Sequence, residues 1–137
     1  MSIILSIKPK FTNLILDGSK TIEMRTKIGK KFINGARIII YSSSPTKAIV
    51  AIAKIKKIQR LNKNKVDINL FQKICISQDF FDQYMENKND CYLIELIDIN
   101  KLKKPITLVE LKKINFTAPQ SFCYSSNDIE QLVMESV

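Results

Sequence analysis

Two short segments, each with an unbroken run of apolar residues at its centre, constrain the fold of this chain most strongly. They are SIILSIK at residues 2–8 and RIIIYSS at residues 37–43. A strand that is apolar throughout, rather than at alternate positions, is typical of a sheet that is covered on both faces. We therefore predict that both segments are buried strands in the interior of a folded domain.

Shorter or alternating patterns predict the remaining elements. Three further strands are expected at residues 21–26, 47–61 and 90–102. Helical spacing of apolar residues predicts helices at residues 9–18, 66–76, 77–88, 107–114 and 127–136. Strands interrupted by short helices, with the first helix between the first two strands, indicate an α+β domain around a mixed, barrel-like sheet of five to six strands.

Polar residues mark where three of these helices begin. Ser77 stands at an N-cap position, and Thr107 with Glu110 has the spacing of a capping box. Asn127 and Glu130 repeat that spacing and predict the start of the terminal helix, which we expect to pack on the barrel.

The bulk properties favour a single domain covering residues 1–137. Of its residues, 45% are hydrophobic, and no linker or internal repeat divides the chain. No apolar run has the length of a membrane span, and the apolar start is too short for a signal peptide, so we expect a cytoplasmic protein without a membrane partner. The three cysteines lack a CxxC pair, which argues against a disulfide framework or a zinc site.

The chain contains no histidine. This absence excludes Ser-His-Asp and Cys-His nucleophile systems and most transition-metal sites. Any catalysis must therefore use Lys, Glu, Asp, Tyr, Thr or Ser, and we expect neither a metal nor a cofactor.

Positive charge is concentrated in the first half of the chain. Residues 1–65 hold 15 Lys and Arg against 2 acidic residues, a net charge of +13, whereas residues 66–137 hold 7 against 11, a net charge of −4. Such a division predicts one positive face that attracts phosphate groups. The alternative is a basic surface that serves solubility alone.

The stretch GSKTIEMRTK, residues 18–27, gathers charged residues on a predicted strand. Because side chains alternate between the faces of a strand, Thr21, Glu23 and Arg25 share one face and the residues between them enter the core. Lys20 stands at a glycine turn and can reach the same face. The pattern fits either the floor of a binding cleft or a surface ion pair, which would contribute under ~1 kcal/mol.

Three stretches resemble the ASCH (activating signal cointegrator homology) family, a relative of the PUA-like RNA-binding barrels. The family's motif Gly-x-Lys-x-x-Glu-x-Arg is filled by Gly18, Lys20, Glu23 and Arg25, which we call the signature residues. The segments RIIIYSSSPTKAIVA and APQSFCY also resemble members of the family. The resemblance extends over residues 3–124.

The resemblance implies a PUA-like β-barrel whose cleft is lined by the signature and binds RNA or a nucleotide-like ligand. Lys20 and Arg25 would contact a phosphate or a base edge, since the guanidinium can donate two parallel hydrogen bonds. Glu23 would accept from an amine of a base or hold Arg25 in place.

Two later loops would supply the rim of this cleft. Its expected residues are Ser42, Ser43, Ser44, Lys47, Gln120, Ser121 and Tyr124. We expect Phe122 to be buried and Tyr124 to face the cleft, where its ring could stack on a base. Without the resemblance, serines before a proline are turn formers and such aromatic residues fill cores.

Two enzymatic alternatives use the same residues. In ASCH-like amidohydrolases acting on N4-acetylcytidine, the residue matching Lys20 activates a threonine, but Glu23 occupies that threonine's position here. Thr21 would have to replace the threonine, with Glu95 as the assisting acid. A ribonuclease needs only a base and cations near the ribose 2′-hydroxyl and phosphate, roles open to Lys20, Glu23 and Arg25.

A third alternative is a regulatory domain that senses a small metabolite and associates with protein partners. Stabilisation by a small ligand, and none by RNA, would identify such a domain.

Overall fold

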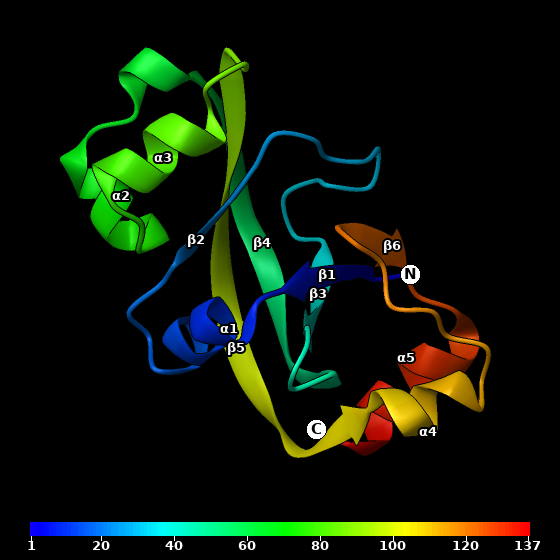
Figure 1. Ribbon diagram of the computed structural model, residues 1–137. Helices are drawn as coiled ribbons and strands as arrows, with labels where there is room; N and C mark the ends of the chain where they lie inside the picture. Colours follow the sequence, from blue (N-terminus) through cyan, green and yellow to red (C-terminus); the bar gives the residue numbers. More distant parts are fainter.

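The computed structural model describes residues 1–137 as one six-stranded sheet with short helices around it (Figure 1). The elements are β1 (Ile3–Ile7), α1 (Pro9–Leu16), β2 (Ile22–Arg25), β3 (Arg37–Ser42), β4 (Ala48–Asn62), the 3-10 turn η1 (Lys63–Lys65), α2 (Ile68–Ile74), α3 (Gln78–Tyr84), β5 (Asp90–Thr107), α4 (Leu108–Lys112), β6 (Phe122–Tyr124) and α5 (Asn127–Glu135). The predicted α+β class is confirmed. No helix in the structure is long and apolar enough to span a membrane.

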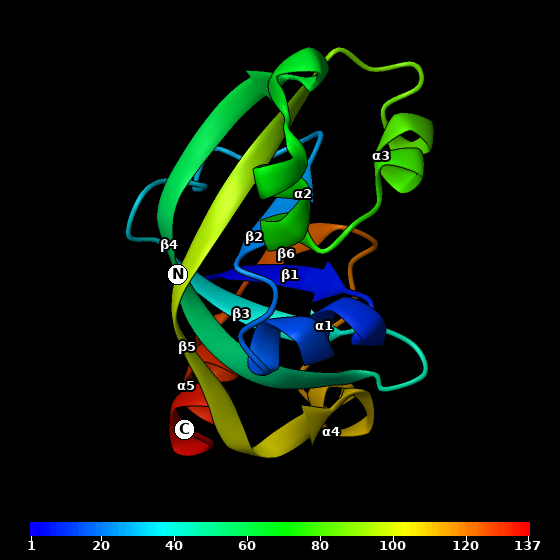
Figure 2. The ribbon, with the colours of Figure 1, turned by 90° about the vertical axis from the view of Figure 1, so that its left-hand side faces the viewer.

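The sheet is mixed and curls into a half-barrel. Its strand order is β2-β5-β4-β3-β1-β6, with β1 parallel to β3 and the other neighbours antiparallel. The long strands β4 and β5 run side by side and curve around the shorter ones (Figure 2). Register shifts interrupt this pair at three places, and such irregularities bend a sheet. Strands β2 and β6 are consequently the two free edges.

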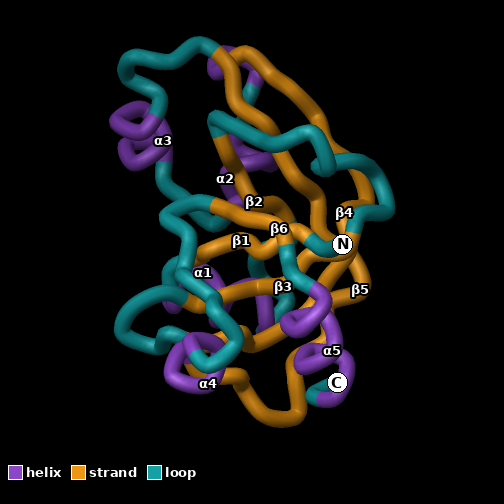
Figure 3. Tube along the Cα trace, turned by 90° about the vertical axis from the view of Figure 1, so that its right-hand side faces the viewer, coloured by secondary structure: helices purple, strands orange, loops and turns teal.

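Three apolar clusters hold the sheet and its helices together. The first fills the curl between β1, β3, β4 and α1, which confirms that the two all-apolar segments are buried strands. The second lies under α4 and α5, and the third under α2 and α3. The two helix pairs therefore cover opposite ends of the half-barrel (Figures 1 and 3).

The N-terminal capping residues of two helices, α3 and α4, are those that the sequence predicts. The Ser77 hydroxyl accepts a hydrogen bond from the backbone N–H of Phe80 at 3.1 Å, and Thr107 with Glu110 forms a complete capping box. These two predictions are confirmed.

The predicted cap of the terminal helix is wrong by one residue. Ser126 is the N-cap of α5, and its hydroxyl accepts from the N–H of Ile129 at 3.3 Å, so Asn127 is already helical. Glu130 instead accepts from the Ser125 hydroxyl at 2.6 Å and pairs with Arg37 at 2.9 Å. Ser126 and Asn127 are adjacent, and both residue types are favoured at N-cap positions. Tertiary contacts therefore determine which of the two caps the helix.

The structure also extends the predicted sheet. Strand β5 continues to Thr107, past Pro105, a residue that reads as a strand breaker in sequence. The sixth strand, β6, is only three residues long and pairs antiparallel with β1. A strand this short carries no periodicity of its own, so pairing with β1 is what defines it.

Candidate functional site

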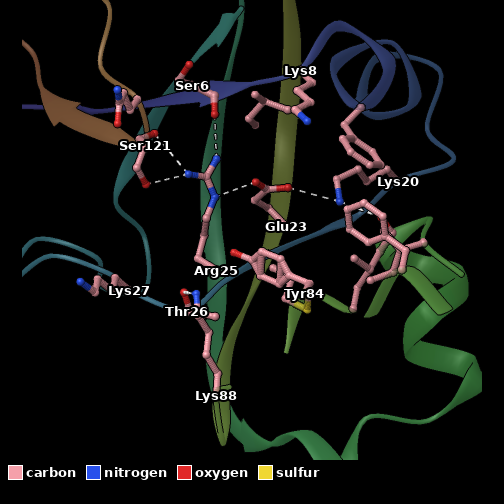
Figure 4. Close-up of a pocket in the computed structure, with 17 residues that line it drawn as sticks. Ser6, Lys8, Lys20, Glu23, Arg25, Thr26, Lys27, Tyr84, Lys88 and Ser121 are labelled. Atoms are coloured by element: carbon pink, nitrogen blue, oxygen red, sulfur yellow. Dashed lines mark hydrogen bonds and ion pairs between the residues drawn. The ribbon is translucent and has the colours of Figure 1, made fainter. Parts of the chain in front are cut away.

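The two free edges of the sheet meet at a seam that Arg25 bridges (Figure 4). From the end of β2, its Nη2 donates to the carbonyl oxygen of Ser6 at 2.9 Å. Its Nη1 donates to the carbonyl oxygen of Ser121 at 3.2 Å and to its hydroxyl at 3.0 Å. Because Ser6 belongs to β1 and Ser121 immediately precedes β6, the guanidinium connects β2, at one edge of the sheet, to β1 and β6 at the other edge.

Glu23 lies between two cations on the floor of this seam. One carboxylate oxygen accepts from Nε of Arg25 at 2.8 Å, and the other is 3.3 Å from Nζ of Lys20. Strand alternation places Glu23 and Arg25 on the same face of β2, as predicted, while Ile22 and Met24 enter the core under α2 and α3. The three charged groups together carry a net charge of +1.

Lys20 is almost entirely enclosed, with 2% of its surface exposed. In addition to Glu23, its ammonium donates to the carbonyl oxygens of Ile22 and Ile74, both at 2.7 Å. An ammonium has three N–H donors, so all of them have partners within the protein. Burial lowers the pKa of Lys20, and the negative charge of Glu23 opposes that effect. Since Ile74 ends α2, Lys20 ties that helix to β2.

A pocket of about 600 Å³ opens over this floor, and we call it the seam pocket. It lies within the usual range of ligand pockets, roughly 300–1,000 Å³. Its charged lining comprises Lys8, Lys20, Arg25, Lys27 and Lys88 against the single carboxylate of Glu23, and its aromatic lining comprises Phe11, Phe80 and Tyr84. The pocket is therefore strongly basic and has aromatic rings within it.

The structure brings five of the predicted site residues together. Lys20, Glu23 and Arg25 form the floor, and Gln120 and Ser121 lie on the rim beside the start of β6. Residues far apart in sequence thus converge on the seam, as the cleft hypothesis requires.

The predicted serine loop does not line the pocket. Ser42 is buried, and its hydroxyl shares a 2.9 Å hydrogen bond with that of Thr12, while the N–H of Ser43 donates to the carbonyl of Ile7. Ser44 and Lys47 are exposed in the turn between β3 and β4, with a cis peptide bond after Ser44. This turn packs beside the end of β1 and against the start of α4, where the N–H of Leu108 donates to the carbonyl of Lys47.

Tyr124 also lies outside the pocket, contrary to its predicted orientation. Its hydroxyl accepts from the N–H of Lys31 at 3.3 Å, and the ammonium of that lysine is 5.2 Å from the centre of the ring. Phe122 is half-buried rather than buried and packs edge-on against Phe32 with ring centres 4.8 Å apart. Pairing of β6 with β1 turns both rings toward the loop between β2 and β3.

The residues of the amidohydrolase hypothesis are not assembled. Thr21 is half-buried and does not line the pocket; its backbone bonds to Lys73 and Leu96. Glu95 pairs with Ile22 across the β2–β5 ladder and therefore faces the side opposite to Glu23. Its nearest cation is Lys56, at 3.9 Å. The alternation of β2 and β5 separates these groups from the floor.

Sequence reasoning missed the wall of the pocket formed by the segment after α2. Phe80, Tyr84 and Lys88 all line it, and they follow one another at intervals of four residues. That spacing, which places side chains along one face of a helix, was the available signal. It could not show which surface that face approaches. Lys8 and Lys27 at the rim were missed because neither belongs to a recognisable motif.

The fold and the assembled signature define an ASCH-like protein. A family model described as "Domain of unknown function (DUF365)" matches residues 1–116, and the chain belongs to this family. It is also similar to a protein of Zymomonas mobilis named "ASCH domain-containing ribonuclease", with 29% identity over 123 residues that cover 88% of this chain and 82% of the relative.

Solved structures agree with this assignment. The crystal structure of the ASCH protein from Zymomonas mobilis has a TM-score of 0.88 and 27% identity, covering 98% of this chain and 94% of that one. The N-terminal domain of Staphylothermus marinus McrB has a TM-score of 0.59 and 15% identity, covering 98% and 93%, and shares the fold alone. The predicted likeness to ASCH proteins is confirmed, whereas the relation to the wider PUA-like group stays a prediction.

Proposed function

We propose that this protein binds RNA in the seam pocket. The observation that carries the proposal is the combination of five cations, one carboxylate and three aromatic rings in a single pocket. The phosphate groups of RNA would bind the cations. Its bases would stack on the aromatic rings and form hydrogen bonds with the polar groups of the floor. The name of the Zymomonas mobilis relative, a ribonuclease, supports RNA as the class of ligand.

The exposed cations of the pocket and those that already have partners within the protein would have different roles. Lys8, Lys27 and Lys88 are exposed at the rim, where their ammonium groups can follow a phosphate backbone. Arg25 uses most of its donors within the protein, but Nη2 carries two hydrogens and contacts only the carbonyl of Ser6. Its remaining N–H and the adjacent Glu23 carboxylate can therefore meet a base edge.

Fluorescence anisotropy with labelled RNA at several salt concentrations tests the proposal. The double variant Lys27→Ala/Lys88→Ala should bind about tenfold more weakly than the wild type and show a shallower salt dependence, since each lost phosphate contact on a single strand lowers the slope by about 0.7. The control variant Lys112→Ala/Lys113→Ala removes the same charge at the opposite end of the half-barrel.

Equal losses in the two double variants would overturn the proposal. That result would mean that RNA is attracted by overall charge and does not occupy the pocket. Arg25→Lys provides a second test: it keeps the positive charge but cannot bridge the seam and present a planar edge, so affinity should still fall.

Ribonuclease activity is the second candidate, and the name of the relative favours it. The floor holds a lysine with a lowered pKa next to a carboxylate and a guanidinium, the groups needed to activate a 2′-hydroxyl and stabilise a phosphate. Binding is better supported than cleavage, because the donors of Lys20 and both oxygens of Glu23 already have partners.

Incubation of end-labelled RNA with purified protein separates the two candidates. Cleavage by this chemistry should disappear when the RNA carries 2′-O-methyl groups and when Glu23 is changed to Gln. Cleavage that persists in Glu23→Gln would indicate a contaminating nuclease, and intact RNA throughout would leave binding as the function.

A further inference from the structure

The seam pocket has an aromatic wall, formed by Phe80 and Tyr84 on one face of α3. Their rings lie nearly parallel, 10° apart, with centres separated by 6.4 Å. Both residues line the pocket, and because the rings are nearly parallel, their faces share one orientation. Parallel rings at successive helical turns form a platform of the kind on which a planar ligand stacks.

Phe80 is not needed to fill the core beneath α3. It is 46% exposed, whereas its neighbour Phe81 is 3% exposed and packs against Phe71 with ring centres 5.0 Å apart. Phe81 and Met85 hold α3 on the sheet through the third apolar cluster. Tyr84 also packs against the edge of this cluster, so Phe80 is the aromatic ring of α3 that packing leaves most open to the pocket.

Charged groups next to the aromatic wall indicate which other chemical groups the ligand carries. The ammonium of Lys88 lies 5.3 Å from the centre of the Tyr84 ring and is 3.4 Å from the hydroxyl of Thr26. A group stacked on the wall would thus carry its negative charge near a cation, with the Glu23–Arg25 pair lining the same pocket. A flat ring, a hydrogen-bonding edge and a phosphate together describe one nucleotide.

We propose that the aromatic wall stacks an unpaired base of the RNA, so that the protein selects single-stranded or extrahelical nucleotides over continuous duplex. This inference rests on the proposed function and makes it more specific. Bases within a duplex present no free face to a protein, whereas unpaired bases can stack on aromatic side chains. Binding would therefore require removal of one base from its neighbours.

An abasic substitution tests the wall directly. A short single-stranded RNA is compared with the same RNA from which one central base has been removed, which leaves every phosphate in place. Wild-type protein should bind the abasic RNA roughly 5- to 150-fold more weakly, the range that corresponds to stacking of one base on aromatic residues. The variant Phe80→Leu/Tyr84→Leu should bind both RNAs with equal, reduced affinity.

The experiment distinguishes failure of the wall from failure of RNA binding. If the wild type binds both RNAs equally but loses affinity in Lys27→Ala/Lys88→Ala, RNA occupies the pocket without stacking, and the wall proposal is overturned. If neither loss occurs, the proposed function fails as well. Ile68→Ala, an exposed apolar change on α2 outside the pocket, should affect neither RNA.

A spectroscopic readout covers the case in which the leucine variant folds poorly. The chain has no tryptophan, so Tyr84→Trp places a single reporter on the wall. Its fluorescence should be quenched by the intact RNA and much less by the abasic one. Val109→Trp, at an exposed position of α4, should respond to neither, and equal responses of the two reporters would refute base stacking at the wall.

Discussion

Replacement of Lys20 by methionine should destabilise the protein strongly, although the substitution keeps most of the apolar stem. The Lys20 side chain is 2% exposed, and its ammonium has three partners, the carbonyls of Ile22 and Ile74 and the carboxylate of Glu23. Removing it leaves two carbonyl oxygens and one face of a buried carboxylate without a donor. Loss of one partner of a buried ion pair costs about 3–5 kcal/mol.

Such a loss is large compared with the whole stability of a domain, about 5–15 kcal/mol. Urea unfolding should show a lower midpoint with little change in slope, and thermal unfolding should shift down by roughly 10–17 °C. The control is Lys54→Met, an exposed lysine on β4, which should change stability by at most about 0.5 kcal/mol.

Hydrogen exchange would locate the damage. Because Lys20 binds the last carbonyl of α2, amides of α2 and α3 should lose protection before those of α4 and α5 at the other end of the half-barrel. A Lys20→Met protein as stable as the wild type would refute this reasoning. If that protein were stable but unable to bind RNA, Lys20 would be a ligand contact and not a structural one.

Three further predictions concern other parts of the molecule. Although burial alone would raise the pKa of Glu130, hydrogen bonds from Ser125 and Ser2 and the charge of Arg37 lower it from its ordinary value of 4.5. A lowered pKa stabilises the folded state above pH 4.5, and this contribution disappears as pH falls through the lowered value, so the stability of wild type and Glu130→Gln should converge in acid. In Gly29→Ala the new Cβ would overlap the Tyr124 hydroxyl, so the free energy of unfolding should fall by an amount typical of overpacking, about 1–3 kcal/mol, and thermal unfolding should occur at a lower temperature. Ser126→Ala removes the α5 cap and should cost about 1 kcal/mol in urea unfolding, whereas Asn127→Ala should cost much less.

Elements whose signals are local were predictable from the sequence. The two all-apolar strands, the turn at Gly18 and the caps at Ser77 and Thr107 follow from the chemistry of a few adjacent residues. The shared face of Glu23 and Arg25 follows from strand alternation in the same way. Strand β6 could not be found like this, because it exists only through pairing with β1, which lies more than a hundred residues earlier.

Tyr124, which was predicted to face the cleft, and Tyr84, which was not, show where sequence reasoning stops. Tyr124 follows a stretch that resembles the family, yet pairing of β6 turns its ring toward Lys31. Tyr84 lies on a helix that sequence places correctly but cannot orient. Its position over the pocket depends on the packing of Phe81 and on the bond from Lys20 to Ile74, contacts between residues distant in the chain.

The division of roles within the pocket follows from these contacts. Lys20 gives all its donors to the protein, Glu23 holds a cation at each oxygen, and Arg25 joins the edges of the sheet. The first role of the signature residues is therefore structural, because their charged groups already have partners within the protein. They close the seam and hold the charged groups of the pocket floor in place. Ligand specificity would therefore depend chiefly on other residues that line the pocket, above all on the segment with Phe80, Tyr84 and Lys88. Chains that keep the signature but alter this segment should keep the fold and change the ligand.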